Sequence, residues 1–289
     1  MTAFQQEGRI KVQGGKVWYG VVGFFEGNQP PLIVVHGGPG MSHNYLLSLK
    51  DVSKNRAVIF YDQLDAGKSD KPDDPDNWNL PRFLDEINCI CAELSIEKFN
   101  LFGNSWGGTV AAAYAAQKPF GLNKLILSSP LIKTSVWVED NELHRSNLPI
   151  EIKIILETCE NNGDTGSEAY MNAVDQFYKK HFCRVNPWPD GLVQTMNLLN
   201  VNCYQKMWGP TEFMCTGLLK NYDGSKDLYK IEVPTLVTCG KFDEATPQST
   251  EKFSKMIPRS EFKVFQKSSH LAFIEEQNAY MSAINNFLN

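Results

Sequence analysis

A serine stands at the centre of a G-x-S-x-G pattern in residues 103–107, where the sequence is GNSWG. An apolar run precedes the pattern and an alanine-rich run follows it, which predicts a strand, a tight turn and a helix. In such a turn the hydroxyl of Ser105 is exposed at the end of a sheet, where it can act as a nucleophile. Gly103 and Gly107 stand where a Cβ atom would collide with the neighbouring strand or helix. The pattern also fits an ordinary glycine-rich turn in which the serine caps the helix. The catalytic interpretation therefore requires that other residues in the chain can activate the hydroxyl.

Two later loops can supply those partners. A serine hydroxyl is a poor nucleophile at neutral pH, so it needs a base within reach and a third group that orients the base. The usual chain order is serine, acid and histidine, with the last two at the carboxyl ends of later strands. Asp243 and His270 each follow an apolar run of strand type. Because the carboxyl ends of parallel strands meet at one edge of a sheet, Ser105, Asp243 and His270 are predicted to form a catalytic triad.

Other acids and histidines compete for these roles. Glu244 is adjacent to Asp243 and could also orient an imidazole, whereas Asp62 precedes the serine and breaks the expected order. His270 could instead be a solvent-facing residue at the start of a helix, and His36 is expected to hold its own loop. The remaining histidines all precede the predicted acid: His43, His144 and His181.

A tetrahedral intermediate on the serine would also need hydrogen-bond donors for its oxyanion. The residue after the nucleophile, Trp106, supplies one backbone N–H group. The loop of residues 36–40, HGGPG, can supply the other, and Gly37 is the predicted donor. Loss of one such donor typically costs ~3 kcal/mol in the barrier.

The runs around these motifs predict an α/β fold, a mostly parallel sheet flanked by helices. Residues 31–35 and 57–61 are continuous apolar runs, typical of strands buried on both faces. Residues 9–12 and 16–24 predict an antiparallel hairpin at the start of the sheet. The other predicted elements are strands over residues 124–127, 233–239 and 262–265 and helices over residues 80–94 and 271–288.

The middle of the chain has a different pattern. From residue 131 to residue 223 the strand-like runs give way to helical spacing, broken by the turn signals NNG and PWPDG. Strand and helix alternate again afterwards, so both flanks belong to one sheet. The predicted organisation is a core of residues 1–130 and 224–289 with an inserted helical cap domain of residues 131–223.

Composition excludes several classes of function. A net charge of −5, with no basic cluster longer than residues 179–180, argues against nucleic-acid binding, which needs a basic face. No apolar run reaches the ~20 residues of a membrane span, and the polar start predicts no signal peptide. The seven scattered cysteines are typical of reduced thiols, so we expect a cytoplasmic protein. Cys89 and Cys91 would point in different directions from one helix, so no metal site is expected there.

Taken together, the motifs resemble those of a known family. They are HGGPG at residues 36–40, GNSWGG at 103–108, GKFDE at 240–244, SH at 269–270 and WGPTEF at 208–213. In this combination the chain resembles the proline iminopeptidases and tricorn-interacting aminopeptidases of the α/β-hydrolase fold, with the related amino-acid amidases. The resemblance extends over essentially the whole chain.

The resemblance implies removal of one residue from the N-terminus of a peptide, through an acyl-enzyme on Ser105. In that family a cap glutamate and the glutamate beside the triad aspartate bind the free α-amine of the substrate, and these positions match Glu212 and Glu244. Two carboxylates in one cleft repel each other until a cation arrives, and a substrate ammonium is such a cation. The chain departs from the family at Asp65. Aspartate tolerates left-handed backbone angles, so the turn can survive, but the effect of the extra carboxylate on the rim of the site is left open by the sequence.

The sequence therefore predicts a serine aminopeptidase that acts on short peptides, amino-acid amides or arylamides with proline or another neutral residue first. The alternatives are an amino-acid amidase, a carboxylesterase or lactonase of the same fold, or an inactive hydrolase fold used for binding. The mechanism needs no metal or organic cofactor. The preferred first residue would depend on four cap side chains: Trp137, Trp188, Tyr204 and Trp208.

Overall fold

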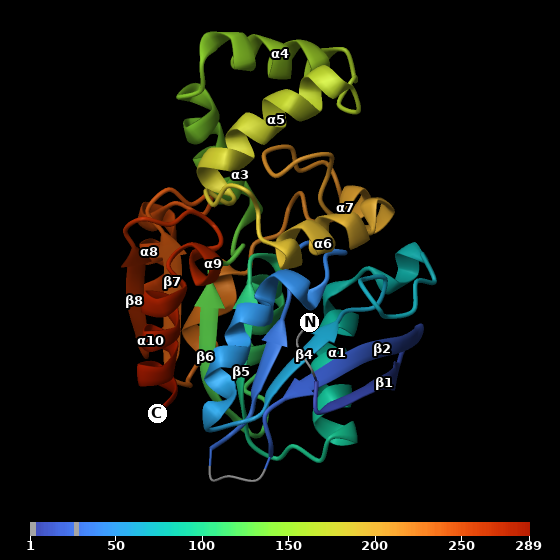
Figure 1. Cartoon of the computed structure of the whole chain (residues 1–289), viewed down its shortest axis with the longest axis vertical. Coiled ribbons are helices and arrows are strands. Elements are labelled where there is room, and N and C mark those ends of the chain that lie inside the picture. Colours follow the sequence, from blue (N-terminus) through green and yellow to red (C-terminus); the bar gives the residue numbers. More distant parts are fainter. Residues whose placement is uncertain (1–3, 26–28) are drawn as a thin grey trace.

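The computed structural model of the chain describes residues 4–25 and 29–289 and contains one eight-stranded sheet (Figure 1). Its strands lie in the order β1-β2-β4-β3-β5-β6-β7-β8. β1 and β2 pair as an antiparallel hairpin, β2 is antiparallel to β4, and all later pairings are parallel. The strands are β1 (Gln6–Val12), β2 (Gly15–Val22), β3 (Leu32–Val35), β4 (Val58–Asp62), β5 (Phe99–Asn104), β6 (Leu122–Ser128), β7 (Thr235–Gly240) and β8 (Ser260–Phe265). The predicted mostly parallel α/β sheet is confirmed.

Helices cover both faces of the sheet because its central strands are apolar on both sides. Leu101 of β5 packs with Phe83 and Val110 from one helical layer, and the next residue, Phe102, packs with Ile284 from the other. The core helices are α1 (Leu80–Glu93), α2 (Trp106–Ala116), α8 (Pro247–Ser254), α9 (Ala272–Glu275) and α10 (Gln277–Leu288), with 3-10 helices η1 (His43–Lys54), η2 (Pro75–Asn77) and η3 (Ser225–Lys230). Over the described residues, no helix has both the length and the apolar character needed to cross a bilayer.

The predicted helix over residues 271–288 is interrupted. Glu276 has φ −124° and ψ 47°, which separates α9 from α10. Its carboxylate accepts hydrogen bonds from the Lys267 N–H group at 2.8 Å and the Ser268 hydroxyl at 2.7 Å. The neighbouring Glu275 carboxylate accepts from the Ser269 N–H group at 3.1 Å. The hydrogen bonds of Glu275 and Glu276 therefore connect the junction between α9 and α10 to the loop that leads into His270.

Five helices lie between β6 and η3, within the segment predicted as the cap. Figure 1 shows this helical insertion gathered at the end of the sheet toward which β6 points. Part of it has an apolar cluster of its own, which includes Leu156, Tyr170, Phe177 and Phe213. The helices are α3 (Thr134–Ser146), α4 (Ile150–Asn161), α5 (Glu168–His181), α6 (Asp190–Leu198) and α7 (Val201–Met207).

The turn between β5 and α2 has almost no free space around it. Ser105 has φ 56° and ψ −122°, outside the regions that side chains prefer. A Cβ atom on Gly103 would lie 2.1 Å from the Gly107 carbonyl oxygen, and one on Gly107 would lie 2.2 Å from the Val35 carbonyl oxygen. Both glycines are therefore required for α2 to approach the sheet closely enough to hold Ser105 in this conformation.

We expect Gly103→Ala to destabilise the protein by at least about 2 kcal/mol, because the added methyl group can be accommodated only if α2 moves away from β5. Urea unfolding compared with the wild type measures this loss. Gly166→Ala is the matched control, since a Cβ atom at this exposed position meets nothing within 4 Å. Equal stabilities for the two variants would contradict the steric explanation.

Candidate active site

Ser105 lies at the carboxyl end of β5, against the loop that follows β3. A Cβ atom on Gly37 would lie 3.1 Å from the Ser105 Cβ, which places the glycine-rich loop directly beside the predicted nucleophile. The serine is half-buried, and among the residues that the structure describes its hydroxyl has no hydrogen-bond partner. In free hydrolases the bond between the nucleophile and its base often tightens only when substrate is present.

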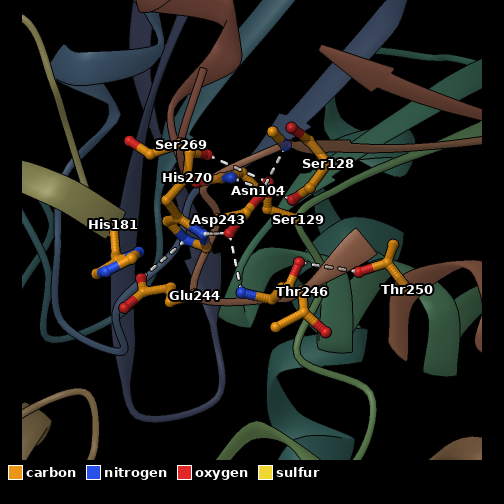
Figure 2. Close-up of polar contacts among 12 residues, drawn as sticks. Asn104, Ser128, Ser129, His181, Asp243, Glu244, Thr246, Thr250, Ser269 and His270 are labelled. Carbon is orange, nitrogen blue, oxygen red and sulfur yellow. Dashed lines mark hydrogen bonds and ion pairs between the residues drawn. The ribbon is translucent and has the colours of Figure 1, made fainter. Parts of the chain in front are cut away.

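Asp243 and His270 are brought together at the same edge of the sheet, as predicted (Figure 2). Asp243 Oδ1 lies 2.8 Å from His270 Nδ1 and also accepts the Ala245 N–H group at 2.9 Å. Asp243 Oδ2 accepts from the Ser129 hydroxyl at 2.6 Å and the Gly240 N–H group at 3.1 Å. Four donors thus fix this buried carboxylate, which in turn orients the imidazole.

The rival acid Asp62 has a different partner. Asp62 Oδ1 lies 2.9 Å from His43 Nδ1, and both side chains are buried beneath Trp18, whose ring stacks on the His43 ring at 4.3 Å. His36 is engaged with its own surroundings, because its Nε2 accepts the Gln63 N–H group at 2.9 Å. The expected structural role of His36 agrees with this contact.

The ring of His270 is held under the helical insertion. Trp137 of α3 meets it edge-on, with centroids 5.6 Å apart, and Phe182 stacks on it at 5.9 Å. The second ring nitrogen, Nε2, lies 3.6 Å from Glu244 Oε1. The nitrogen that would receive a proton from Ser105 is therefore next to a carboxyl group of the adjacent loop.

The predicted oxyanion donor Gly37 is already engaged. Its N–H group donates to the Tyr45 hydroxyl at 2.7 Å, and this hydroxyl donates to Asn104 Oδ1 at 2.8 Å. By contrast, the N–H groups of Gly38 and Trp106 have no acceptor within the part of the chain that the structure describes. The free donors beside Ser105 are therefore the amide that follows Gly37 and the one that follows the serine.

Glu244 is a buried carboxyl group that makes no hydrogen bond to the described residues. Its exposed fraction is 0%, and in the described residues neither carboxyl oxygen has a hydrogen-bond partner. Glu212 is nearby and accepts one bond, from the Tyr204 hydroxyl at 2.6 Å. Burial, and then the charges of Glu212 and Asp243, raise the pKa of Glu244 well above its ordinary value. Burial also raises the pKa of Glu212.

Comparison with known proteins identifies the family. The alpha/beta hydrolase fold family matches residues 30–277. The chain is 43% identical to the proline iminopeptidase of Heyndrickxia coagulans over 98% of each chain. The chain belongs to the proline iminopeptidase family. Its members are serine aminopeptidases of the α/β-hydrolase fold, and this chain is one of them.

Solved structures agree with this placement. The crystal structure of VinJ superposes with a TM-score of 0.96 at 32% identity and covers 99% of each chain. The proline iminopeptidase of Mycobacterium smegmatis superposes with a TM-score of 0.91 at 32% identity, over 98% of this chain and 97% of that one. The fold and the family predicted from the motifs are therefore confirmed.

The aromatic side chains of the insertion hold the segment that carries Glu212. The Trp137 indole donates to the Glu212 carbonyl at 3.1 Å, and the Trp208 indole donates to the Thr211 carbonyl at 2.8 Å.

Tyr204 and Glu212 line an apolar cavity of about 270 Å³. Its other walls include Met41, Met171, Tyr178, Phe182, Met196 and Leu199. Trp188 lies behind Phe182, with ring centroids 5.9 Å apart.

Asp65, whose effect on the rim the sequence left open, does not add a free carboxylate there. The residue has φ 68°, the left-handed conformation that aspartate tolerates, and it is fully buried. Its carboxylate accepts from the Asp73 N–H group at 2.7 Å and the Trp78 indole at 2.9 Å. Asp65 therefore holds the loop between β4 and α1.

Two residues of the site, Tyr45 and Gln63, were given no role from the sequence. Tyr45 contacts Asn104, and Gln63 contacts Trp106, from segments far apart in the chain. Gln63 accepts from the Trp106 indole at 2.9 Å and donates to the His36 carbonyl at 2.8 Å. Ser129 had a usable signal, since it follows β6 at the edge where the triad assembles. Among the described residues no group of three or more His, Cys, Asp and Glu side chains is arranged to hold a metal ion.

The raised pKa of Glu244 makes stability depend on pH. A carboxyl group whose pKa is higher in the folded state stabilises the fold at low pH, and this contribution is lost as pH rises above the ordinary value of 4.5. We expect Glu244→Gln to raise Tm by a few degrees at pH 8 and by much less at pH 4.5. Thermal unfolding across this range is the measurement, with Glu157→Gln on the exposed face of α4 as the control. A Tm difference that does not vary with pH would contradict the burial argument.

Proposed function

We propose that Ser105, His270 and Asp243 release the N-terminal residue of short peptides, amino-acid amides or arylamides, and that Glu212 and Glu244 recognise its free amine. The observation that carries the proposal is a pair of glutamates beside His270. Glu244 is fully buried and has no hydrogen-bond partner among the described residues, and Glu212 is half-buried and accepts one bond, from Tyr204. Such a pair is costly to bury unless a cation binds between the two groups. The ammonium of a peptide N-terminus has this charge and arrives with the scissile carbonyl two bonds away.

In the proposed reaction His270 Nε2 takes the proton of Ser105 as the hydroxyl attacks the carbonyl carbon. Asp243 holds Nδ1 and stabilises the imidazolium that forms. His270 then returns the proton to the leaving amine, and the same steps with water release the N-terminal residue. The proton at Nδ1 stays where it is throughout, because Asp243 fixes the orientation of the ring.

The oxyanion that forms in each step is proposed to bind the N–H groups of Trp106 and Gly38. Gly38 replaces Gly37 in this role because the N–H group of Gly37 already donates to Tyr45. Gly37 and Tyr45 then support the loop, since the Tyr45 hydroxyl links it to Asn104 beside the nucleophile. Fixed backbone donors of this kind lower the barrier because they need no reorganisation when charge develops.

Residues 131–223 are proposed to act as the cap domain over this site. They supply Glu212 and two aromatic side chains that enclose His270, so the insertion both encloses and selects the substrate. The seven cysteines are unpaired, which fits the proposed cytoplasmic location. An esterase or lactonase with an uncharged acyl group would gain nothing from two buried carboxyl groups, so the aminopeptidase assignment is favoured.

We expect the protein to cleave amino-acid arylamides with a free amine and to leave their N-acetylated forms intact. The measurement is a rate comparison of free and acetylated proline, alanine and phenylalanine arylamides. Ser105→Ala is expected to keep the fold and lose turnover by at least about 10⁴-fold, because the acyl-enzyme cannot form. Equal rates on free and acetylated substrates would overturn the proposed recognition of the amine.

We expect Glu212→Gln to lower kcat/KM for free-amine arylamides about 100-fold, since it removes a buried charge that faces the substrate ammonium. Hydrolysis of an amine-free acyl ester should change little, because the triad and the oxyanion donors are untouched. Glu157→Gln is again the control for a charge change on the insertion. Equal losses on both substrates would show that Glu212 supports the structure without binding the amine.

A further inference from the structure

Three consecutive carbonyl groups in residues 242–244 accept hydrogen bonds from side chains of the insertion. The first lies 2.8 Å from His181 Nδ1, and the second lies 2.9 Å from His144 Nε2. The third accepts a longer bond, at 3.5 Å, from the Asn141 amide. Asn141 and His144 belong to α3, and His181 ends α5. Two helices of the insertion therefore hold the main chain of one loop of the core.

The two imidazoles work as a pair. Their rings stack with centroids 3.9 Å apart and planes 23° apart. A carbonyl oxygen only accepts hydrogen bonds, so His181 Nδ1 and His144 Nε2 must both carry hydrogen. Burial, and then the neighbouring His144, lower the pKa of His181 to about 4, so its ring is neutral at neutral pH. The pair therefore offers two N–H groups in fixed directions.

His181 also contacts the loop of the catalytic histidine. The His270 N–H group donates to the His181 carbonyl at 3.1 Å. The same residue thus binds the loop of the triad acid through its ring and the loop of the triad base through its main chain. Phe177 packs against both stacked rings, at 5.0 Å from the ring of His181 and 6.5 Å from that of His144.

The position of the Glu244 carboxyl group depends on the hydrogen bonds to the carbonyl groups of residues 242–244 more than the position of the Asp243 carboxylate does. The Asp243 carboxylate has four hydrogen bonds of its own, from Ser129, Gly240, Ala245 and His270. The Glu244 carboxyl group has none among the described residues, so side-chain bonds do not set its place. Its position follows from the main chain of residues 242–244, which the insertion holds.

We propose that His144 and His181 are positioning residues that place the Glu244 carboxyl group for the substrate amine by holding the carbonyl groups of Asp243 and Phe242. The inference rests on the amine-binding role proposed above. It assigns the insertion a second contribution to recognition besides Glu212. It also assigns an effect on specificity to two cap histidines, although neither takes part in proton transfer.

The test uses amides that either reproduce or displace each donor. A glutamine amide reaches about as far as histidine Nε2 and an asparagine amide about as far as Nδ1, so His144→Gln and His181→Asn keep the donors in place. His144→Asn and His181→Gln keep the polarity but move the donors. His144→Leu and His181→Leu remove them. Each variant is assayed with a free-amine arylamide and with an amine-free acyl ester, and its Tm is recorded.

We expect the leucine and displaced-donor variants to lose about tenfold or more in kcat/KM on the arylamide and less than about threefold on the ester. The variants that keep the donors should stay within about threefold of the wild type on both substrates. If the leucine variants do not fold, the displaced-donor variants decide the matter, because they retain a polar side chain at each position.

Three outcomes would overturn the inference. Wild-type kinetics in the displaced-donor variants, with only Tm changed, would show a purely structural role. Equal losses on arylamide and ester would show that the histidines support the triad and not Glu244. The variants that keep the donors could also lose as much kcat/KM as the displaced-donor variants. That result would show that the position of the donor does not matter. A wild type that cleaves acetylated arylamides equally well would instead refute the amine-binding function itself.

Discussion

Two glutamates brought together in a place poor in water are the feature on which the rest of the site depends. Burial raises the pKa of Glu212 and Glu244, which means that their charged forms carry an electrostatic cost in this site. In the proposed function a substrate ammonium would offset that cost. Exposed glutamates would carry no such cost, because water would screen their charges. The helical insertion is what excludes water here: it covers His270 with Trp137 and Phe182 and supplies Tyr204 to Glu212.

The turn between β5 and α2, which carries Ser105, imposes a second, steric constraint at the same edge of the sheet. Ser105 keeps its conformation because Gly103 and Gly107 let α2 lie against β5 and β3 with no room for a methyl group. The oxyanion loop is then held beside it by Tyr45 and Asn104. The predicted nucleophile and the glycine-rich loop are therefore fixed by packing inside the core, whereas the proposed amine site lies between the core and the insertion.

The segment from Gly240 to Glu244 connects these two regions. Its aspartate contacts Nδ1 of His270, and its glutamate lies near Nε2, at the proposed amine site. The core holds the Asp243 carboxylate directly, through Ser129 and two main-chain N–H groups. The insertion holds the carbonyl groups of the same segment through two histidines. The proposed triad acid and one of the two proposed amine-binding glutamates thus lie on one loop.

What could be predicted from the sequence was local or followed from chain order. Continuous apolar runs indicated strands buried on both faces, and these became the parallel strands of the sheet. The pattern around Ser105, and the place of Asp243 and His270 after later strands, indicated the triad, because parallel strands bring their carboxyl ends to one edge. The roles of Glu212 and Glu244 came from the family resemblance, since neither residue stands in a motif with a physical signature of its own.

The sequence by itself determined the fold class and the tight turn at Ser105, and it indicated the order of the predicted triad, because hydrophobic periodicity and glycine placement act through near neighbours in the chain. Only the tertiary structure decided which donors are free, which carboxyl groups are paired and what holds the catalytic loop. The Gly37 amide is occupied by Tyr45, the Asp65 carboxylate is buried with Trp78, and His144 and His181 meet the carbonyl groups of residues 242–244. The two histidines lie 99 and 61 residues along the chain from the carbonyl groups they contact. The Gly37 and Asp65 contacts are closer in sequence, but they form only once their loops have packed onto the sheet.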